Sequence, residues 1–223
     1  MCIFTPSKCG GKIDKDTVIT VGEECTYEFE EKKSIFIASV FVVTSKEQAQ
    51  ERVDELKQKY YDATHNCYAY VLRDGAYRKF SDDGEPSGTA GMPILNVIER
   101  LSLCNTLVVV TRYFGGIKLG AGGLVRAYST AAADVLTKAG KSIYVKGSKG
   151  IIDVDYDNLG LVERYLNSNG VTINDKTFGN GVTISVTTNK PWEEIENTVT
   201  DICAGGAICE LEGNVWVKQS DID

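Results

Sequence analysis

The sequence has few of the features that mark a secreted, membrane-bound or uniformly basic protein. No run of about 18 apolar residues occurs, so we expect no membrane span. The first residues lack the apolar segment that follows a basic start in a signal peptide, which predicts a cytoplasmic protein. A net charge of −7 argues against a nucleic-acid-binding protein that is basic throughout.

The cysteines lack the spacing of a metal site or a disulfide framework. The chain has seven of them, irregularly spaced and without a Cys-x-x-Cys pair, so we expect reduced thiols. His65, the single histidine, lies two residues before Cys67. A nucleophilic Cys67 with His65 as its base is one interpretation, and a buried structural thiol is the favoured one. No Gly-x-Ser-x-Gly motif is present to suggest a hydrolytic triad.

The acidic excess is concentrated in the last third of the chain. Residues 1–140 contain 17 Lys and Arg and 18 Asp and Glu, a net charge of −1. Residues 141–223 contain 7 and 13, a net charge of −6. A local basic patch in the first part could therefore still bind a polyanion.

Hydrophobic periodicity predicts alternating strands and helices in residues 1–140, which indicates an α/β domain. A helix is expected after Ser45, where Gln48 can complete a capping box. Gly140 is a typical helix stop. The expected strands cover residues 35–43, 66–72 and 105–114, and two further helices cover residues 92–101 and 123–140.

Residues 141–223 predict a second domain. Its first segment, up to residue 150, is rich in glycine and poor in apolar residues, which predicts a linker or a short edge strand. A strand, a helix, a hairpin turning at Gly179-Asn180-Gly181, another helix and a final strand follow. This β-α-β-β-α-β order is the ferredoxin-like pattern.

A glycine-rich segment with basic residues leads into the helix expected at Gly123. Glycines before a helix N-terminus expose backbone N–H groups that can bind an anion. Neither the P-loop nor the dinucleotide-binding pattern fits the spacing. Tight turns and close helix–strand packing explain the glycines equally well. The candidate phosphate-binding residues are Arg112, Tyr113, Gly115, Gly116, Lys118, Gly120, Gly122, Gly123 and Arg126.

Three carboxylates precede this segment in the sequence FSDDGEPSGTAGMPIL. Asp82, Asp83 and Glu85 are candidate ligands of a magnesium ion, which proteins often hold through one or two carboxylates and phosphate oxygens. The favoured interpretation is that they form turns or pair with an arginine, for example Asp82 or Glu85 with Arg112.

Four motifs together resemble the IMPACT/YigZ family: KKSIFIAS, DATHNCYAY, SDDGEPSGTAGMPIL and VVVTRYFGGIKLGAGGLVRAYSTAA. The resemblance runs from about residue 20 to residue 137. The rest of the chain is similar to the smaller domain of bacterial members, so the chain resembles the bacterial YigZ type. The RWD domain of eukaryotic members has no counterpart in it.

The resemblance also implies folds for both domains. The first would resemble domain IV of elongation factor G and the GHMP kinases, and the second would resemble domain V of that factor. In GHMP kinases a glycine-rich loop at a helix start holds nucleotide phosphate. The Ser-Ser-Ala segment of that loop is absent here, which argues against kinase activity.

The leading expectation is a cytoplasmic, non-enzymatic regulator of translation without a cofactor, because eukaryotic relatives are implicated in translational control under stress. Its partner would be RNA, the ribosome or a translation-associated protein. Arg112, Lys118 and Arg126 would contact phosphate, and Tyr113 and Phe114 would stack on bases.

Two alternatives stay open. One is an enzyme acting on a nucleotide or a phosphorylated small molecule, with magnesium held by Asp82, Asp83 or Glu85 and proton transfer by His65. The other is a protein-interaction module in which the motifs serve only the fold.

Overall fold

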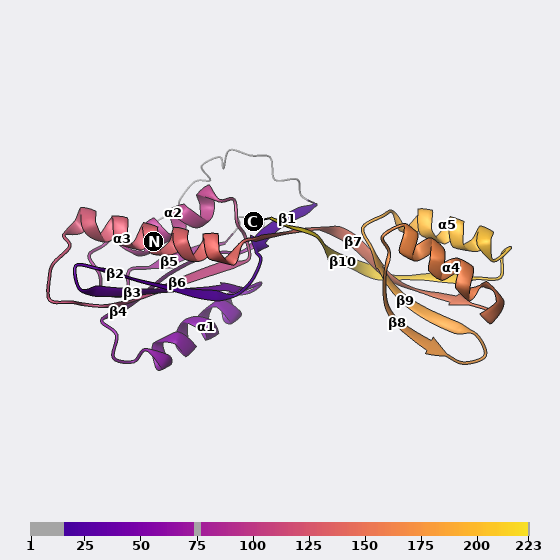
Figure 1. The fold of residues 1–223 in the computed structure, drawn as a ribbon, viewed down its shortest axis with the longest axis horizontal. Helices are drawn as coiled ribbons and strands as arrows, with labels where there is room; N and C mark the ends of the chain where they lie inside the picture. Colours follow the sequence, from indigo (N-terminus) through magenta and orange to yellow (C-terminus); the bar gives the residue numbers. More distant parts are fainter. Residues whose placement is uncertain (1–15, 74–76, 223) are drawn as a thin grey trace. The chain divides into compact units, whose positions relative to one another are not determined.

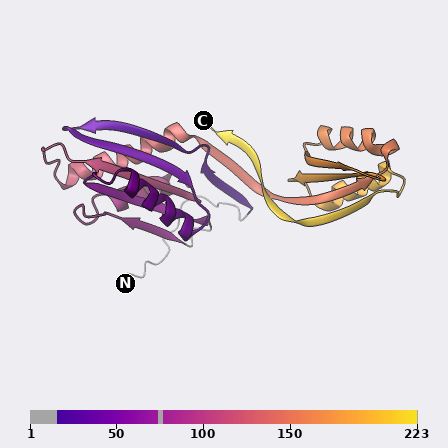
Figure 2. The ribbon, with the colours of Figure 1, turned by 90° about the horizontal axis from the view of Figure 1, so that it is seen from below.

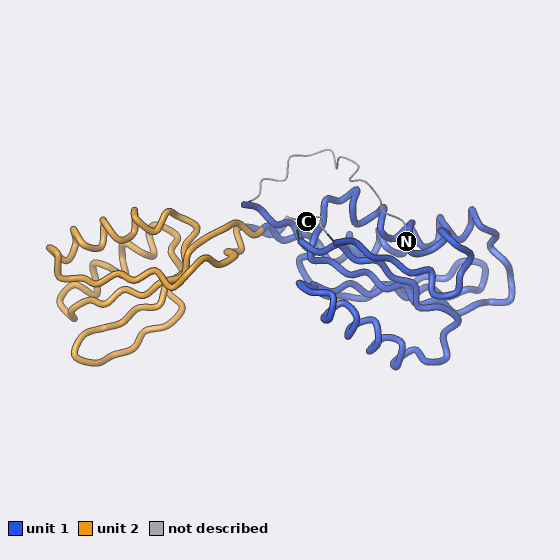
Figure 3. Tube along the Cα trace, turned by 180° about the vertical axis from the view of Figure 1, so that it is seen from behind, with its two compact units in different colours: residues 1–143, 220–223 blue, residues 144–219 orange. Residues whose placement is uncertain are grey.

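The computed structural model describes residues 16–73 and 77–222. Within it the chain forms two compact units, and the second unit consists of residues 144–219 (Figure 3). The sequence-based boundary between residues 140 and 141 thus differs from the structure in two respects. The second unit begins three residues later, and the chain returns to the first unit at Ser220.

The first unit contains a five-stranded antiparallel sheet with helices on both faces (Figures 1 and 2). The strand order is β2-β3-β6-β4-β5. Helices α2 and α3 cover one face, and α1 covers the other. The bounds are β2 Cys25–Glu31, β3 Ser34–Val42, α1 Lys46–Lys59, β4 His65–Val71, β5 Arg78–Ser81, α2 Gly91–Arg100, β6 Thr106–Tyr113 and α3 Ala121–Ala139.

The central strands are apolar on both sides because each side packs against a helix layer. On β4, Cys67 and Ala69 face α2 and α3, whereas Tyr68 and Tyr70 face α1. Side chains alternate along a strand, so one strand contributes to both cores. The expected strands at residues 35–43, 66–72 and 105–114 are confirmed as β3, β4 and β6.

The helix predicted after Ser45 is confirmed as α1. The Ser45 hydroxyl accepts a hydrogen bond from the N–H of Gln48 at 3.2 Å. The Gln48 side chain accepts from the N–H of Thr44 at 2.8 Å, one residue before the position that a capping box uses. Ala49, Val53 and Leu56 form its buried face.

The second unit has the ferredoxin-like fold that the β-α-β-β-α-β order predicted. Its strand order is β10-β7-β9-β8. Helices α4 and α5 pack on this sheet, and the core includes Ile152, Val162, Ile184 and Ile195. The bounds are β7 Lys141–Val154, α4 Tyr156–Ser168, β8 Thr172–Phe178, β9 Val182–Thr188, α5 Trp192–Ile202 and β10 Ile208–Ile222.

The segment up to residue 150 is a strand, which corrects the prediction of a linker or a short edge strand. It is the first part of the 14-residue β7, which pairs with β1 (Thr17–Val21), β9 and β10. A Cβ at Gly147 would lie 2.3 Å from the Thr188 carbonyl oxygen, and a Cβ at Gly150 would lie 2.3 Å from the Trp192 ring. These glycines therefore allow close packing, which sequence composition cannot distinguish from flexibility.

None of the helices in the described ranges is long and apolar enough to cross a membrane.

Candidate functional site

The two sequence motifs meet at one end of the first sheet. His65 begins β4 and lies opposite Arg112, which is near the end of β6. Phe36 on β3 lies opposite Arg112 on its other side. The segment after β5 returns to this end, where Asp83 bonds to β4. The antiparallel register thus gathers residues that are up to about 80 positions apart.

A buried ion pair between Glu85 and Arg112 is the centre of this end. Nη1 of Arg112 donates to Oε1 of Glu85 at 2.6 Å, and the two side chains are only 6% and 3% exposed. Nη2 donates to the Ser34 hydroxyl at 3.3 Å. The guanidinium also lies 5.5 Å from the Phe114 ring centroid. Arg112 therefore holds the loop to the sheet and does not present its charge to solvent, which corrects its expected role as a phosphate contact.

Tyr128 of α3 joins the same cluster. Its hydroxyl donates to Oε1 of Glu85 at 2.8 Å, and its ring packs edge-on against Phe36. Burial raises the pKa of Tyr128, so the hydroxyl stays protonated and remains a donor. Glu85 thus ties β6 and α3 together through one carboxylate oxygen.

Cys67 does not have the environment of a nucleophile. It is fully buried, and its Sγ lies 2.9 Å from the Asp82 carbonyl oxygen and 3.4 Å from the Tyr128 hydroxyl. Burial raises the pKa of this thiol to about 12. Since the thiolate is the reactive form, the structural interpretation of Cys67 is the one that the geometry supports.

His65 is oriented by backbone and lies near Glu85. Its Nδ1 is 2.8 Å from the Asp83 carbonyl oxygen, which can only accept, so Nδ1 carries the proton. Its Nε2 lies 3.9 Å from Oε2 of Glu85. The ring therefore packs beside the buried ion pair and supports the loop that carries Glu85.

Asp82 and Asp83 bind different protein groups. The Asp82 carboxylate accepts from the N–H groups of Gly88, Ala90 and Gly91, and so caps the start of α2. The Asp83 carboxylate accepts from Nζ of Lys57 and from the N–H of Asn66, both at 2.7 Å. These bonds explain the acidic motif as a loop-forming element.

The three candidate magnesium ligands are thus engaged by separate donors. Asp82 binds backbone N–H groups, Asp83 binds Lys57 and Asn66, and Glu85 binds Arg112 and Tyr128. In the part of the chain that the structure describes, no group of three or more His, Cys, Asp or Glu side chains is placed to hold a metal ion.

The start of α3 is open to solvent and has no side-chain cap. Gly120 is the N-cap residue and has a φ of +74°, which favours glycine. Lys118 before the helix and Arg126 in its second turn are exposed, and so are Gly120 and Gly122. The first N–H groups of the helix and two cations therefore face solvent together, as the anion-site interpretation requires.

The other predicted residues divide between packing and exposure. Gly115 packs against the β2–β3 turn, where an added Cβ would lie 1.9 Å from the Lys33 carbonyl oxygen. Gly116, with a φ of +83°, shapes the loop, and Gly123 shapes the first turn of α3. The Tyr113 hydroxyl donates to Asp62, and Phe114 is 46% exposed. Phe114 is thus better placed than Tyr113 to contact a ligand.

Two lysines that the sequence motifs did not assign to this surface also belong to it. Lys32 and Lys33 form the β2–β3 turn, are exposed, and have φ values of +49° and +64°. Gly115 brings this turn against the glycine-rich loop. The sequence signal for these two lysines is the Lys-Lys pair in KKSIFIAS. That pair does not show where the side chains lie until the β2–β3 hairpin has formed. Lys32, Lys33, Lys118, Arg126 and the first N–H groups of α3 are called the basic end below.

Comparisons with known proteins match both units. The Impact N-terminal domain matches residues 32–136, and a domain of unknown function (DUF1949) matches residues 152–205. IMPACT family member YvyE of Bacillus subtilis is 43% identical over 150 residues, which cover 66% of this chain and 68% of that protein. An IMPACT family member of Haemophilus influenzae is 34% identical over 189 residues, 83% of this chain and 92% of that protein.

A solved structure supports the fold. It is described as the crystal structure of a hypothetical protein and aligns with a TM-score of 0.58 and 29% identity. The alignment covers 87% of this chain and 96% of that one. The resemblance seen in the motifs is thereby confirmed, and the chain belongs to the IMPACT family, in the two-domain form of its bacterial YigZ type.

Proposed function

We propose that this chain is a non-enzymatic regulator of translation that binds RNA through the basic end of its first unit. The observation that carries the proposal is the uncapped start of α3, with exposed Lys118 and Arg126 beside it. Membership of a family whose eukaryotic members are implicated in translational control supports the cellular role.

The basic end combines the groups that a single-stranded phosphate backbone requires. Free N–H groups at a helix start hydrogen-bond to phosphate oxygens, and the helix dipole adds a partial positive charge. Lys32 and Lys33 extend the positive surface across the β2–β3 turn. The exposed ring of Phe114 offers a surface on which a base can stack.

The buried cluster has a positioning role in this proposal. Glu85, Arg112 and Tyr128 join the acidic loop, β6 and α3 through hydrogen bonds of 2.6 and 2.8 Å. They therefore fix the direction in which the loop approaches the helix start. We expect changes to these residues to affect the fold first and RNA binding only through it.

Titration of a fluorescently labelled single-stranded RNA tests the proposal. Lys118→Ala with Arg126→Ala, and separately Lys32→Ala with Lys33→Ala, should each weaken binding by about tenfold. Lys138→Ala with Lys59→Ala is the matched control, since it removes two exposed positive charges from the last turns of α3 and α1. The logarithm of the affinity should fall with the logarithm of salt concentration with a slope of about −3, as expected for four phosphate contacts.

Binding that is flat against salt, or equal losses in the control variant and the basic-end variants, would contradict the proposal. A pull-down from lysate with and without ribonuclease distinguishes an RNA-binding protein from a protein-interaction module. If the chain is a protein-interaction module, its partner would still be captured after ribonuclease treatment. The variant with Lys118→Ala and Arg126→Ala would bind that partner as tightly as the unmodified chain does. The magnesium-dependent alternative has less support, because Asp82, Asp83 and Glu85 already bind protein donors.

A further inference from the structure

Phe114 is an exposed aromatic ring that the fold holds in place beside the basic end. Its side chain is 46% exposed, and its backbone N–H donates to the Thr64 hydroxyl at 3.0 Å. The next residue, Gly115, packs against the backbone of Lys33 in the β2–β3 turn. The ring and the lysines of that turn therefore belong to one surface.

The Arg112 guanidinium lies on the inner side of this ring. Its Cζ is 5.5 Å from the centroid of Phe114 and 5.6 Å from the centroid of Phe36. Nε of Arg112 is buried and has no hydrogen-bond partner among the residues that the structure describes. The two rings therefore provide part of its stabilisation, since a cation is attracted to the face of an aromatic ring. Glu85 and Ser34 fix the guanidinium, which in turn positions the Phe114 ring.

The buried cation affects which ring the outer face of Phe114 binds best. A positive charge on the inner face draws π electron density inward, so the outer face favours an electron-rich partner. Purines are more electron-rich than pyrimidines, and their two fused rings cover more of the phenyl surface. A base can stack on a side chain only when it is unpaired, because both of its faces are covered inside a duplex.

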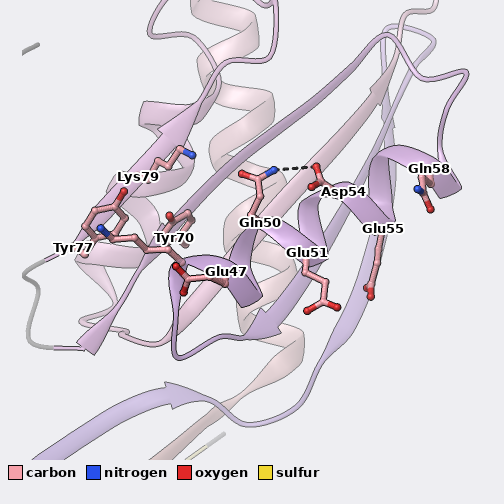
Figure 4. Close-up of a pocket in the computed structure, with 10 residues that line it drawn as sticks. Glu47, Gln50, Glu51, Asp54, Glu55, Gln58, Tyr70, Tyr77 and Lys79 are labelled. Atoms are coloured by element: carbon pink, nitrogen blue, oxygen red, sulfur yellow. Dashed lines mark hydrogen bonds between the residues drawn. The ribbon is translucent and has the colours of Figure 1, made fainter.

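The α1 side of the first unit is unfavourable for the rest of the RNA strand. A groove with a volume of about 740 Å³ lies there between α1 and the strands β4 and β5 (Figure 4). Four carboxylates line it against only two lysines, Lys46 and Lys79, so the groove repels phosphate. A strand that stacks a base on Phe114 therefore continues toward Lys118 and the start of α3. The carboxylates are those of Glu47, Glu51, Asp54 and Glu55.

We propose that Phe114 selects an unpaired purine in the RNA that the basic end binds. The purine stacks on the outer face of the ring, and its flanking phosphates lie at the β2–β3 turn and at Lys118. Arg112 is a positioning residue in this arrangement, because it contacts the ring and not the base. The inference rests on the proposed function and narrows its ligand to single-stranded RNA that contains purines.

Fluorescence anisotropy with the full chain and labelled octaadenylate and octauridylate tests the inference. The quantity to compare is the ratio of the two affinities, because self-stacking of free octaadenylate is the same in every titration. Phe114→Leu should lower the preference for octaadenylate by about fivefold, whereas Phe114→Trp should retain it. Phe80→Leu is the matched control and should leave the ratio unchanged. Phe80 is 39% exposed on the edge strand β5, where its sheet neighbour is Ala69.

The same titrations separate a failure of the inference from a failure of the proposed function. If both RNAs bind with salt-dependent affinity and Phe114→Leu leaves the ratio unchanged, the basic end binds RNA and the inference is wrong. An equal fall in the ratio for Phe80→Leu would also overturn it, since the effect would not be specific to Phe114. Absence of binding to either RNA would overturn both.

A lower ratio for Phe114→Leu alone, with Phe114→Trp similar to the unmodified chain, supports the inference. Far-ultraviolet circular dichroism checks that each variant is folded.

Discussion

At the scale of single residues, Glu85 and Arg112 show how sequence and structure assign different roles to the same motif. In the sequence they look like two charged residues in glycine-rich surface loops. In the structure both side chains are at least nine-tenths buried and paired with each other. The exposed charges of the basic end are instead those of Lys32, Lys33, Lys118 and Arg126.

We expect Glu85→Gln to lower the free energy of unfolding by about 3 kcal/mol, because it leaves the buried Arg112 guanidinium without a counter-charge. Urea denaturation measures this. Glu163→Gln, which breaks a partly exposed ion pair with Lys176, is the control and should cost less than about 1 kcal/mol. A loss for Glu85→Gln as small as that of the control would show that the pair contributes little.

Cys67 should be almost unreactive in the native protein. With the pKa of the thiol raised to about 12, thiolate accumulates only as the pH approaches that value. At pH 8 the thiolate fraction is about one in ten thousand. Mass spectrometry after iodoacetamide treatment should find Cys67 modified in urea and unmodified without it. Rapid native modification would mean that the thiol is neither buried nor protonated.

At the scale of elements, the segment between β6 and α3 combines packing glycines with exposed ones. Gly115 lies against the β2–β3 turn, and its N–H donates to the Ser34 hydroxyl at 3.2 Å. Gly122 is in the first turn of α3, and among the described residues nothing beyond its own helix lies within 4 Å of the position that a Cβ would take. In the sequence these glycines look like one group, because only the tertiary neighbours separate them.

Alanine substitution should separate the two kinds of glycine. Gly115→Ala should destabilise the first unit by about 2 kcal/mol or more, since the new Cβ would overlap the Lys33 carbonyl. Gly122→Ala should raise stability by up to about 1 kcal/mol, because alanine is the better helix former and the position is open. Thermal denaturation compares the variants. Equal destabilisation by both would contradict this division.

At the scale of the whole molecule, the two units have separate cores and different charge. Residues 144–219 contain six Lys and Arg and eleven Asp and Glu, a net charge of −5. The basic end belongs to the first unit. The second unit is therefore the more acidic of the two.

We expect the units to respond separately to core mutations. Trp192 and Trp216, the two tryptophans, are both in the second unit, so tryptophan fluorescence reports its unfolding. Ile184→Ala should lower the fluorescence midpoint, whereas Ile98→Ala should leave it unchanged and lower the stability seen by circular dichroism; each loss should be about 3 kcal/mol. If both variants shift both signals together, the chain unfolds as one cooperative unit.

Prediction from sequence worked where one residue pattern has one structural solution. The two-sided apolar runs of β3, β4 and β6 and the amphipathic pattern of α1 are of this kind. The edge strands β2 and β5 escaped prediction because half or more of their side chains face solvent and carry a weak signal. Lys32 and Lys33 of the β2–β3 turn also face solvent, and their place in the basic end escaped prediction for the same reason.

The sequence by itself determined the family, the α/β character of the first unit and the ferredoxin-like order of the second. Long motifs and local periodicity carry that information in neighbouring residues. Tertiary structure alone decided which charges are exposed, since burial depends on partners such as Glu85 and Arg112 that are 27 positions apart. It also packed Tyr70 and Tyr77 with the apolar side chains of α1, because these residues meet only when the helix lies on the sheet.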